Sequence, residues 1–369
     1  MTRPPDILVV GAGIVGAAIA YELARRGAPV TVVDGRGPGQ GASRASAGVL
    51  APYIEGHEDG TLLEMGRRSL ALYDAFVRDV NEDARTDLEV DRSGTLTVAF
   101  TSDEAVELER MAEAFVDRSV THRIVSRPEL RVMEPRLSDG GLLGLALPDH
   151  AYVRVPALTA AVARAAAHHG ARIEEGVRVT GLRPDRSGVT VATTAGPRRA
   201  ASVVVAAGSW AGKIAIDGAP PVPVRPVRGQ LVYLRSPSRV VRRTLWSRRC
   251  YVVPWSDGTM LVGATVEEAG FDESATVAGV RGLLDAATEL LPGMGDYRFD
   301  EVRVGLRPGT RDDLPVIGRM APASDIVVAA GHFRNGVLLA PLTAELVADL
   351  ILEGREDPVL ATLGAGRFA

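Results

Sequence analysis

The chain contains 369 residues, which at about 150 residues per domain predicts two or three domains. Hydrophobic residues make up 46% and charged residues 24%, an ordinary globular composition that argues against disorder, collagen-like repeats and coiled coil. The net charge of −4 provides no electrostatic footprint for nucleic acid. A single cysteine, Cys250, excludes an internal disulfide framework and a cysteine-based metal site, and it fits a reducing cytoplasm.

The first apolar run is interrupted by glycines and lacks a clear cleavage site, which argues against a secretion signal. We find no gap-free apolar stretch of the roughly 18 residues that a membrane helix requires. We therefore expect a cytoplasmic protein that binds neither membranes nor nucleic acid.

The N-terminal residues predict a strand, a helix and a second strand. Residues 6–10 are a short apolar run, residues 13–26 have apolar side chains at helical spacing, and residues 29–33 return as a strand. Gly27 is a suitable helix cap. This order is that of a βαβ unit.

The remaining elements alternate between helical and extended patterns. Residues 60–80, 102–118, 156–169, 276–291 and 342–352 favour helices, and 94–100, 172–181, 188–194, 203–206, 229–235, 250–255, 259–265 and 325–330 favour strands. Strand–helix alternation at both ends, with β signals between, indicates one α/β domain assembled from discontinuous segments.

Residues 11–16 match G-x-G-x-x-G between the first strand and the first helix, which is the context that the motif requires. Gly11 permits a tight turn, Gly13 allows the backbone to approach a pyrophosphate, and Gly16 allows close packing of helix and strand. Asp34 ends the second strand, where a carboxylate can accept hydrogen bonds from a ribose. The alternative is a glycine-rich turn with a surface aspartate, but the complete pattern favours a dinucleotide, FAD or NAD.

The loop at residues 40–52 is composed mostly of small side chains. Backbone amides can therefore lie close to phosphates or a flavin, and Ser43 and Ser46 add hydroxyl groups. The alternative is a flexible surface loop. Its position directly after the βαβ unit favours contact with FAD.

These motifs together carry a family resemblance. The N-terminal fingerprint, the small-residue loop, residues 205–210 (Val-Ala-Ala-Gly-Ser-Trp) and residues 331–336 (Gly-His-Phe-Arg-Asn-Gly) resemble the FAD-dependent D-amino-acid oxidase superfamily. The C-terminal third is most similar to the glycine oxidases of that superfamily. The closer match lies in residues 249–254, 261–265, 305–310 and 331–341.

The resemblance implies a Rossmann-like FAD domain and a smaller substrate domain on an antiparallel β-sheet. We assign residues 1–80, 140–215 and 300–369 to the first and residues 81–139 and 216–299 to the second. It also implies oxidation of a small amino acid to an imine and 2-oxoacid, with oxygen reduced to hydrogen peroxide, in thiamine thiazole biosynthesis. A homotetramer is implied as well. Relatives with covalent flavin use a cysteine in the C-terminal part, which this chain lacks, so we expect non-covalent FAD.

The resemblance implies that three residues bind the substrate. Arg307 would clamp the substrate carboxylate, Tyr251 would hydrogen-bond it, and Arg334 would lie on its other side. The planar fork of an arginine suits two parallel bonds to a carboxylate. A surface salt bridge for Arg307 and a core position for Tyr251 are the alternatives. The motif and the resemblance together predict these cofactor-binding residues: Gly11, Gly13, Ile14, Val15, Gly16, Asp34, Gly35, Ala42, Ser43, Ala47, Gly48, Val49, Val177, Gly208, Trp210, His332, Phe333, Asn335, Gly336, Val337 and Leu338.

Other chemistries have little support. The histidines show no metal-ligand spacing, no serine lies in a G-x-S-x-G elbow, and His332 is expected to pack on the flavin rather than act as a base. The chain departs from the glycine oxidases at Arg249 and Val266, two positions that the resemblance places near the substrate. These departures leave the choice among glycine, sarcosine, other N-substituted glycines and small D-amino acids open. A dehydrogenase with another electron acceptor and a non-catalytic flavin-binding subunit remain alternatives.

Overall fold

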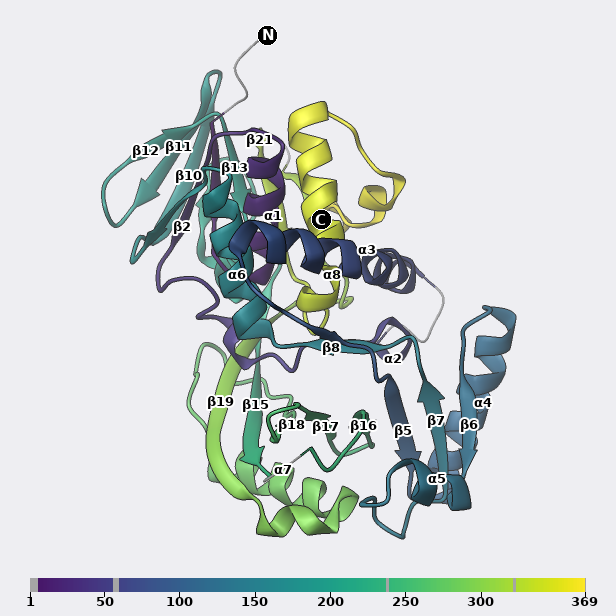
Figure 1. Ribbon diagram of the computed structural model, residues 1–369. Coiled ribbons are helices and arrows are strands. Elements are labelled where there is room, and N and C mark those ends of the chain that lie inside the picture. Colours follow the sequence, from purple (N-terminus) through teal and green to yellow (C-terminus); the bar gives the residue numbers. More distant parts are fainter. Residues whose placement is uncertain (1–5, 56–59, 237–238, 321–322, 369) are drawn as a thin grey trace.

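The computed structural model describes residues 6–55, 60–236, 239–320 and 323–368 (Figure 1). A parallel sheet with its helices forms the upper part of Figure 1, and a larger, mostly antiparallel sheet forms the lower part. Within the described ranges, no helix has both the length and the apolar character needed to cross a membrane.

The six-stranded sheet is parallel except at one edge, where β20 runs antiparallel to β21. In spatial order its strands are β20 (Val316–Met320), β21 (Ala323–Ala330), β13 (Ser202–Val205), β1 (Ile7–Val10), β2 (Val30–Asp34) and β9 (Arg172–Glu175). Side chains of β1 alternate between two hydrophobic clusters, Ile7 and Val9 in one, Leu8 and Val10 in the other. Because both faces are covered, the strand is apolar throughout.

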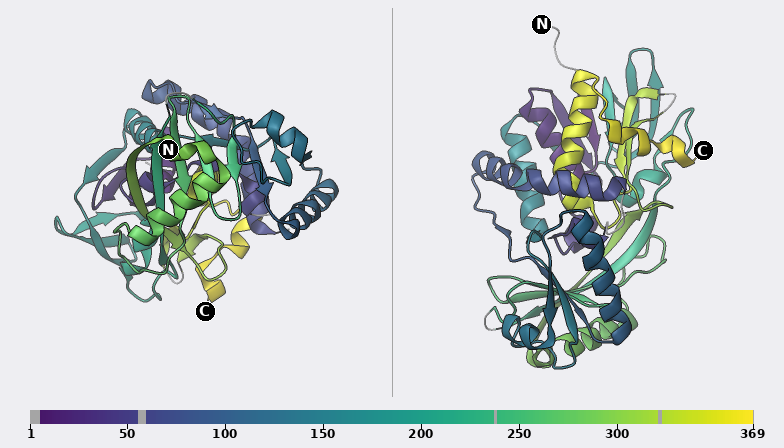
Figure 2. Two further views of the ribbon diagram at one scale, coloured as in Figure 1. Left: turned by 90° about the horizontal axis from the view of Figure 1, so that it is seen from below. Right: turned by 90° about the vertical axis from the view of Figure 1, so that its right-hand side faces the viewer.

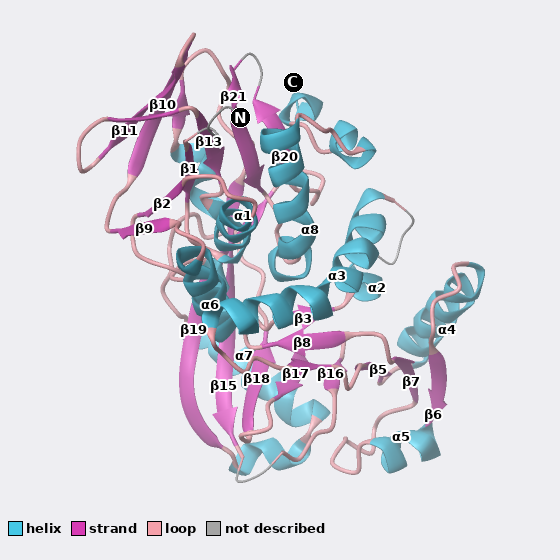
Figure 3. Ribbon diagram, turned by 45° about the horizontal axis from the view of Figure 1, so that its top comes forward, coloured by secondary structure: helices cyan, strands magenta, loops and turns pink. Residues whose placement is uncertain are grey.

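Helices cover one face of this sheet (Figure 3). They are α1 (Ile14–Arg25), α3 (Thr61–Ala84), α6 (Val155–His168) and α8 (Gly336–Ala348). A four-stranded sheet packs on the opposite face. Its spatial order is β12 (Arg198–Ala200), β11 (Gly188–Thr193), β10 (Val179–Asp185) and β14 (Ala215–Ile216). The Rossmann-like layering that we expected is confirmed.

One predicted strand, residues 172–181, is wrong as a single element. The structure divides it into β9, at the edge of the six-stranded sheet, and β10, in the four-stranded sheet. Gly176 lies between them with a positive φ of 74°, a conformation that glycine adopts without strain. The chain therefore changes sheets at a glycine that the apolar pattern alone does not identify as a break.

The lower part is an eight-stranded sheet in which all neighbours but β16 and β5 are antiparallel. Its spatial order is β19 (Arg298–Gly309), β15 (Arg225–Arg235), β18 (Thr259–Gly263), β17 (Tyr251–Pro254), β16 (Thr244–Trp246), β5 (Thr95–Ala99), β7 (Leu143–Leu147) and β6 (Arg123–Ser126). Helix α7 (Val277–Leu290) lies across one face, as the view from below shows (Figure 2). The other helices here are α4 (Ser102–Asp117) and α5 (Arg127–Met133).

A small sheet lies between the two parts (Figure 3). It consists of β3 (Val49–Leu50), β8 (Ala151–Val153) and β4 (Val90–Asp91), with the short helix α2 (Pro52–Glu55) beside it. Strand β7 and most of β19 belong to the eight-stranded sheet although they fall within segments that we assigned to the FAD domain. The assignment of whole segments to two domains stays a prediction.

The C-terminal helix begins earlier than the sequence predicts. We expected residues 342–352, but α8 starts at Gly336 and contains Pro341. A proline cannot donate to the carbonyl four residues before it, which here is that of Val337. The hydroxyl of Tyr73 donates to the Val337 carbonyl over 2.7 Å and so replaces the missing bond. Ser69 donates to the Leu338 carbonyl over 2.6 Å. Helix α3 thus supports the first turns of α8.

Candidate active site

A cavity of about 540 Å³ lies where the carboxyl ends of the parallel strands meet the eight-stranded sheet. Ligands of open α/β sheets bind at this edge of the strands. The lining includes the three predicted substrate residues, Tyr251, Arg307 and Arg334. It also includes all but two of the predicted cofactor residues, namely Gly11, Gly13, Ile14, Val15, Asp34, Gly35, Ala42, Ser43, Ala47, Gly48, Val49, Val177, Gly208, Trp210, His332, Phe333, Asn335, Gly336 and Val337.

Gly16 and Leu338 lie outside this lining. A Cβ on Gly16 would overlap the carbonyl oxygen of Gly11, so Gly16 allows the helix to pack against the turn. Leu338 is buried among the helices.

The glycine-rich turn leaves room for a phosphate group. Gly11 has a φ of 106°, and a Cβ there would overlap the Ala206 carbonyl. Helix α1 starts directly afterwards with no acidic side chain in its first turn. Its positive N-terminal end therefore faces the cavity with no carboxylate from the helix itself, an arrangement that suits a pyrophosphate.

Two side chains hold this turn in place. Asp34 accepts hydrogen bonds from the backbone N–H groups of Ala12 (2.7 Å), Arg36 (2.7 Å) and Gly37 (3.0 Å). The buried Ser43 hydroxyl accepts from the N–H of Ile14 over 2.9 Å. The Asp34 carboxylate lines the cavity at the end of β2, which is the position that ribose recognition requires. The donors, the acid and the small loop residues fit a dinucleotide such as FAD.

Arg307 lies on β19 against the backbone of β15. A Cβ on Gly229 would overlap its guanidinium. Nη1 of Arg307 donates to the Thr265 carbonyl over 2.9 Å and to the Arg228 carbonyl over 3.4 Å. These bonds orient the guanidinium at the cavity wall, where a planar cation can bind a carboxylate.

Tyr251 lies on the same face of the sheet. Its ring occupies the space above Gly263, where a Cβ would overlap the phenol. Trp246, its partner across β16 and β17, packs beside it with ring centroids 4.8 Å apart and also lines the cavity. Exposed Arg334 lines the same cavity from the loop before α8. The cavity thus brings two arginines and a phenol beside a dinucleotide-type turn.

His332 is fully enclosed at the base of the cavity. Its Nε2 lies 3.1 Å from the hydroxyl of Thr343 in α8, and burial lowers the pKa of the imidazole to about 4. The ring is therefore neutral at neutral pH and anchored to the helix. This arrangement favours the packing role that we expected over general-base catalysis.

Sequence analysis overlooked several residues that line the cavity. Trp246 is the most informative, because only four residues separate it from Tyr251 in a hairpin whose cross-strand pairing would have identified it. No local pattern distinguishes the others, which come from loops and strand ends. They include Arg36, Arg178, Thr180, Lys213 and Ile214.

The two departures from the glycine oxidase pattern do not line the cavity. Arg249 is exposed and forms an ion pair with Glu289 of α7, and the side chain of Val266 is 59% exposed. The expectation that both positions lie near the substrate is not supported. Neither side chain therefore forms part of the cavity wall.

A separate cluster joins α3 and α6. Asp83, His168 and His169 place one ligand atom each within 4.8 Å of one another. The Asp83 carboxylate accepts from the Tyr21 hydroxyl (2.6 Å) and lies 2.8 Å from Nε2 of His169. Burial opposes ionisation of Asp83, but these hydrogen bonds hold its pKa below the ordinary value. The bonds account for the cluster, and the absence of a metal stays a prediction.

Comparisons with known proteins agree with this geometry. A family model described as FAD dependent oxidoreductase matches residues 6–350. The chain is 36% identical over 353 residues to the glycine oxidase of Geobacillus kaustophilus, covering 95% of this chain and 94% of that protein. The crystal structure of glycine oxidase from that organism superimposes with a TM-score of 0.94 at 34% identity, covering 99% of each chain. A bifunctional ThiO/ThiG protein of Nostoc sp. is 35% identical, and the chain spans 54% of its length.

Proposed function

We propose, from the premise that this chain belongs to the family of FAD-dependent oxidoreductases, that it oxidises glycine or a closely related small amino acid with oxygen as electron acceptor. Sarcosine, other N-substituted glycines and small D-amino acids belong to the same substrate class. The observation that carries the proposal is the single cavity that Arg307 and Tyr251 share with the glycine-rich turn. A carboxylate bound by these two residues would hold its amino acid beside the dinucleotide.

The residues that would hold FAD are those of the turn, the small-residue loop and the loop before α8. FAD bound there would supply a two-electron acceptor for hydride transfer from the substrate Cα, and reduction of oxygen would yield hydrogen peroxide. The substrate becomes an imine, and water converts the imine to an oxoacid and ammonia or a primary amine. The chemistry requires only loss of one ammonium proton, so no strong protein base is needed.

The protein contributes mainly position. Arg307 would form charge-assisted bonds to the substrate carboxylate, and the hydroxyl of Tyr251 would donate to it. Trp246 narrows the space beside them, which favours a substrate with a small or absent side chain. Holding the reacting carbon in one place in this way lowers the entropy cost of the reaction, a contribution of several kcal/mol.

The test is peroxide formation by the purified yellow protein with glycine, sarcosine, D-alanine and D-proline, and with L-alanine and L-proline as controls. We expect peroxide from glycine or sarcosine and none from the L-amino acids. Anaerobic bleaching without peroxide in air would instead indicate a dehydrogenase with another acceptor. A flavin that is neither bleached nor turned over by any of these compounds would contradict the proposal.

Further parts of the proposal concern the setting of the enzyme. The similarity to the bifunctional ThiO/ThiG protein of Nostoc sp. supports a role beside the thiazole branch of thiamine biosynthesis. We also propose a cytoplasmic homo-oligomer, a tetramer by resemblance, with non-covalent FAD. Cys250 is buried with its thiol pKa raised to about 11 by burial, which does not favour a reactive thiolate. Size-exclusion chromatography with light scattering tests the tetramer, and release of FAD on denaturation tests the attachment.

A further inference from the structure

The ladder between β15 and β18 contains an irregularity beside Arg307. Leu231 pairs with Gly263, whereas Arg228 bridges Glu267 with backbone bonds of 2.8 Å and 3.0 Å. The three steps from Arg228 to Leu231 thus oppose the four steps from Gly263 to Glu267, so residues 264–266 contain one extra residue. An extra residue of this kind is a β-bulge, and bulges turn neighbouring groups in new directions.

The bulge presents a carbonyl to Arg307. Thr265 lies within it, and its carbonyl accepts the 2.9 Å bond from Nη1 of Arg307. The backbone N–H of Gln230 donates to the Thr265 hydroxyl over 2.9 Å. The orientation of the Arg307 guanidinium therefore depends on how the bulge is held.

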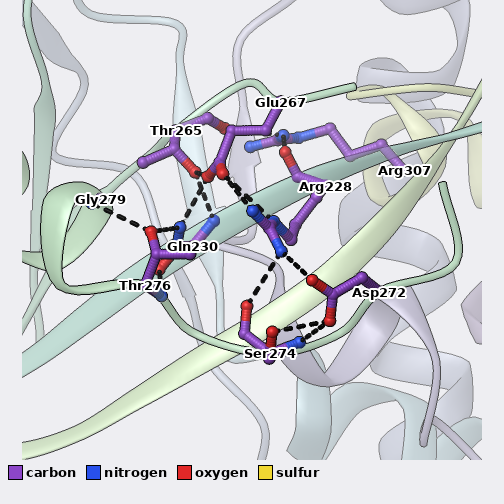
Figure 4. Close-up of polar contacts among 9 residues, drawn as sticks. All are labelled: Arg228, Gln230, Thr265, Glu267, Asp272, Ser274, Thr276, Gly279 and Arg307. Carbon is purple, nitrogen blue, oxygen red and sulfur yellow. Dashed lines mark hydrogen bonds and ion pairs between the residues drawn. The ribbon is translucent and has the colours of Figure 1, made fainter. Parts of the chain in front are cut away.

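A polar network behind β15 holds the bulge (Figure 4). Oε1 of Glu267 accepts from the hydroxyl of Thr265 (2.5 Å) and from Nε2 of Gln230 (2.6 Å). The Gln230 side chain is fully buried and also bonds Thr276, the N-cap of α7, through Nε2 (2.9 Å) and Oε1 (2.9 Å). Glu267 thus connects the bulge to a fixed helix terminus.

The second oxygen of Glu267 holds a nearly buried cation. Oε2 accepts from Nε (3.2 Å) and Nη2 (2.5 Å) of Arg228, whose side chain is 8% exposed. Nη1 of Arg228 donates to Asp272 over 2.6 Å. Burial opposes ionisation of Glu267, but its hydrogen bonds and Arg228 hold its pKa below the ordinary value. Removing Glu267 would leave the Arg228 guanidinium with Asp272 as its remaining carboxylate partner and would weaken the network.

We propose that Glu267 is a positioning residue for substrate binding, because it holds the bulge whose Thr265 carbonyl orients Arg307. The inference rests on the proposed function, in which Arg307 binds the substrate carboxylate. Glu267 itself does not line the cavity. Its effect is transmitted through the backbone of Thr265 and Arg228.

The experiment compares Glu267→Leu, Glu267→Gln and wild type as FAD-loaded proteins. The control is Glu268→Gln, because Glu268 is adjacent, exposed and paired only with exposed Arg225 in the described part of the chain. Acetate is the probe of the carboxylate site, and its Kd is measured from the change in flavin absorbance. KM and kcat for glycine, FAD content and Tm are measured in parallel.

We expect Glu267→Leu to raise the Kd of acetate and the KM for glycine about tenfold or more, as loss of one charge-assisted hydrogen bond would. The kcat and the FAD content should change much less. Glu267→Gln retains an acceptor for Thr265 and should recover most of the affinity, and Glu268→Gln should match wild type. If Glu267→Leu does not fold, Glu267→Asp takes its place, because its shorter side chain draws the carboxylate away from Thr265 and should raise the Kd of acetate at unchanged FAD content.

Equal acetate affinity in all four proteins would overturn the positioning role. A parallel loss of kcat, FAD and thermal stability with no selective effect on acetate would also overturn it, because it would indicate a general structural role. Acetate binding does not require turnover. Wild type that binds acetate but oxidises none of the tested amino acids would therefore contradict the proposed function, while the acetate Kd values would still test the positioning role.

Discussion

Arg307 and Gly229 occupy one space on neighbouring strands. The guanidinium of Arg307, on β19, lies where a side chain at Gly229 of β15 would be. The two positions lie 78 positions apart in the chain and come together through the β15–β19 ladder. Arg307 can therefore lie against the sheet because residue 229 is a glycine and has no side chain.

Replacing Gly229 by alanine should displace the guanidinium of Arg307. We expect the KM for glycine to rise about tenfold or more, the effect of losing one charge-assisted hydrogen bond, while FAD remains bound. Steady-state kinetics and flavin absorbance measure both. Gly282→Ala in α7 is the control, because no atom lies within 4 Å of an added Cβ there. An unchanged KM in Gly229→Ala would contradict the role of Arg307.

Trp246 should limit the size of the substrate. The indole packs against Tyr251 and lines the cavity. Trp246→Ala should therefore raise the ratio of kcat/KM for D-proline to kcat/KM for glycine about tenfold. This is the lower end of the effect of about 1–3 kcal/mol that one apolar group has on discrimination between substrates. Trp255→Ala, at a tryptophan outside the lining, is the control. An unchanged ratio of the two kcat/KM values in Trp246→Ala would show that Trp246 does not limit the size of the substrate.

Asp34→Ala should weaken FAD binding. The carboxylate holds the N–H groups of Ala12, Arg36 and Gly37 and faces the proposed ribose position. Loss of bonds to a charged acceptor predicts a rise in the Kd of FAD of about tenfold or more, measured by fluorescence titration of the apoprotein. Asp217→Ala removes an exposed carboxylate that pairs with Arg183 and should leave this Kd unchanged. Equal FAD retention in both variants would refute the ribose role.

Tyr73→Phe should destabilise the start of α8. The buried hydroxyl is the partner of the Val337 carbonyl that Pro341 cannot satisfy, so its loss should cost about 1–3 kcal/mol of unfolding free energy. Tyr297→Phe is the control, since its hydroxyl has no hydrogen-bond partner within the ranges that the structure describes. Thermal unfolding at equal FAD saturation measures the difference. A Tm equal to that of the control would mean that the helix tolerates the unsatisfied carbonyl.

The buried histidine should make the protein labile to acid. Burial lowers the pKa of His332 from about 6.5 to about 4, so stability is complete above pH 6.5 and falls as the pH approaches 4. The expected slope is up to about 1.4 kcal/mol per pH unit, because the unfolded chain binds a proton that the folded protein excludes. His332→Gln should flatten the dependence of unfolding free energy on pH in this window.

His122→Gln is the matched variant for this measurement, since His122 is only partly buried and lies far along the chain from the cavity. His150, whose pKa burial lowers to about 3, should preserve part of the slope in both variants. Identical slopes of unfolding free energy against pH in His332→Gln and wild type would show that protonation of His332 does not cause the loss of stability in acid.

Much of the fold was predictable because its signals are local. The strand, glycine-rich turn, helix and acid of the βαβ unit lie within residues 6–34, where periodicity and spacing identify each part. The helices at 102–118, 156–169 and 276–291 agree with α4, α6 and α7 to within one residue. Where a helix depends on distant side chains, as α8 depends on Ser69 and Tyr73 around Pro341, the predicted start was wrong.

The sequence by itself determined the nucleotide-binding unit and the residue types available for a carboxylate, because these follow from contiguous patterns. Only the tertiary structure decided which residues share the cavity. It put Arg307 over Gly229 and directed Arg249 and Val266 away from the cavity. The physical reason is that strand pairing and side-chain direction between distant segments depend on register, and register does not appear in local periodicity.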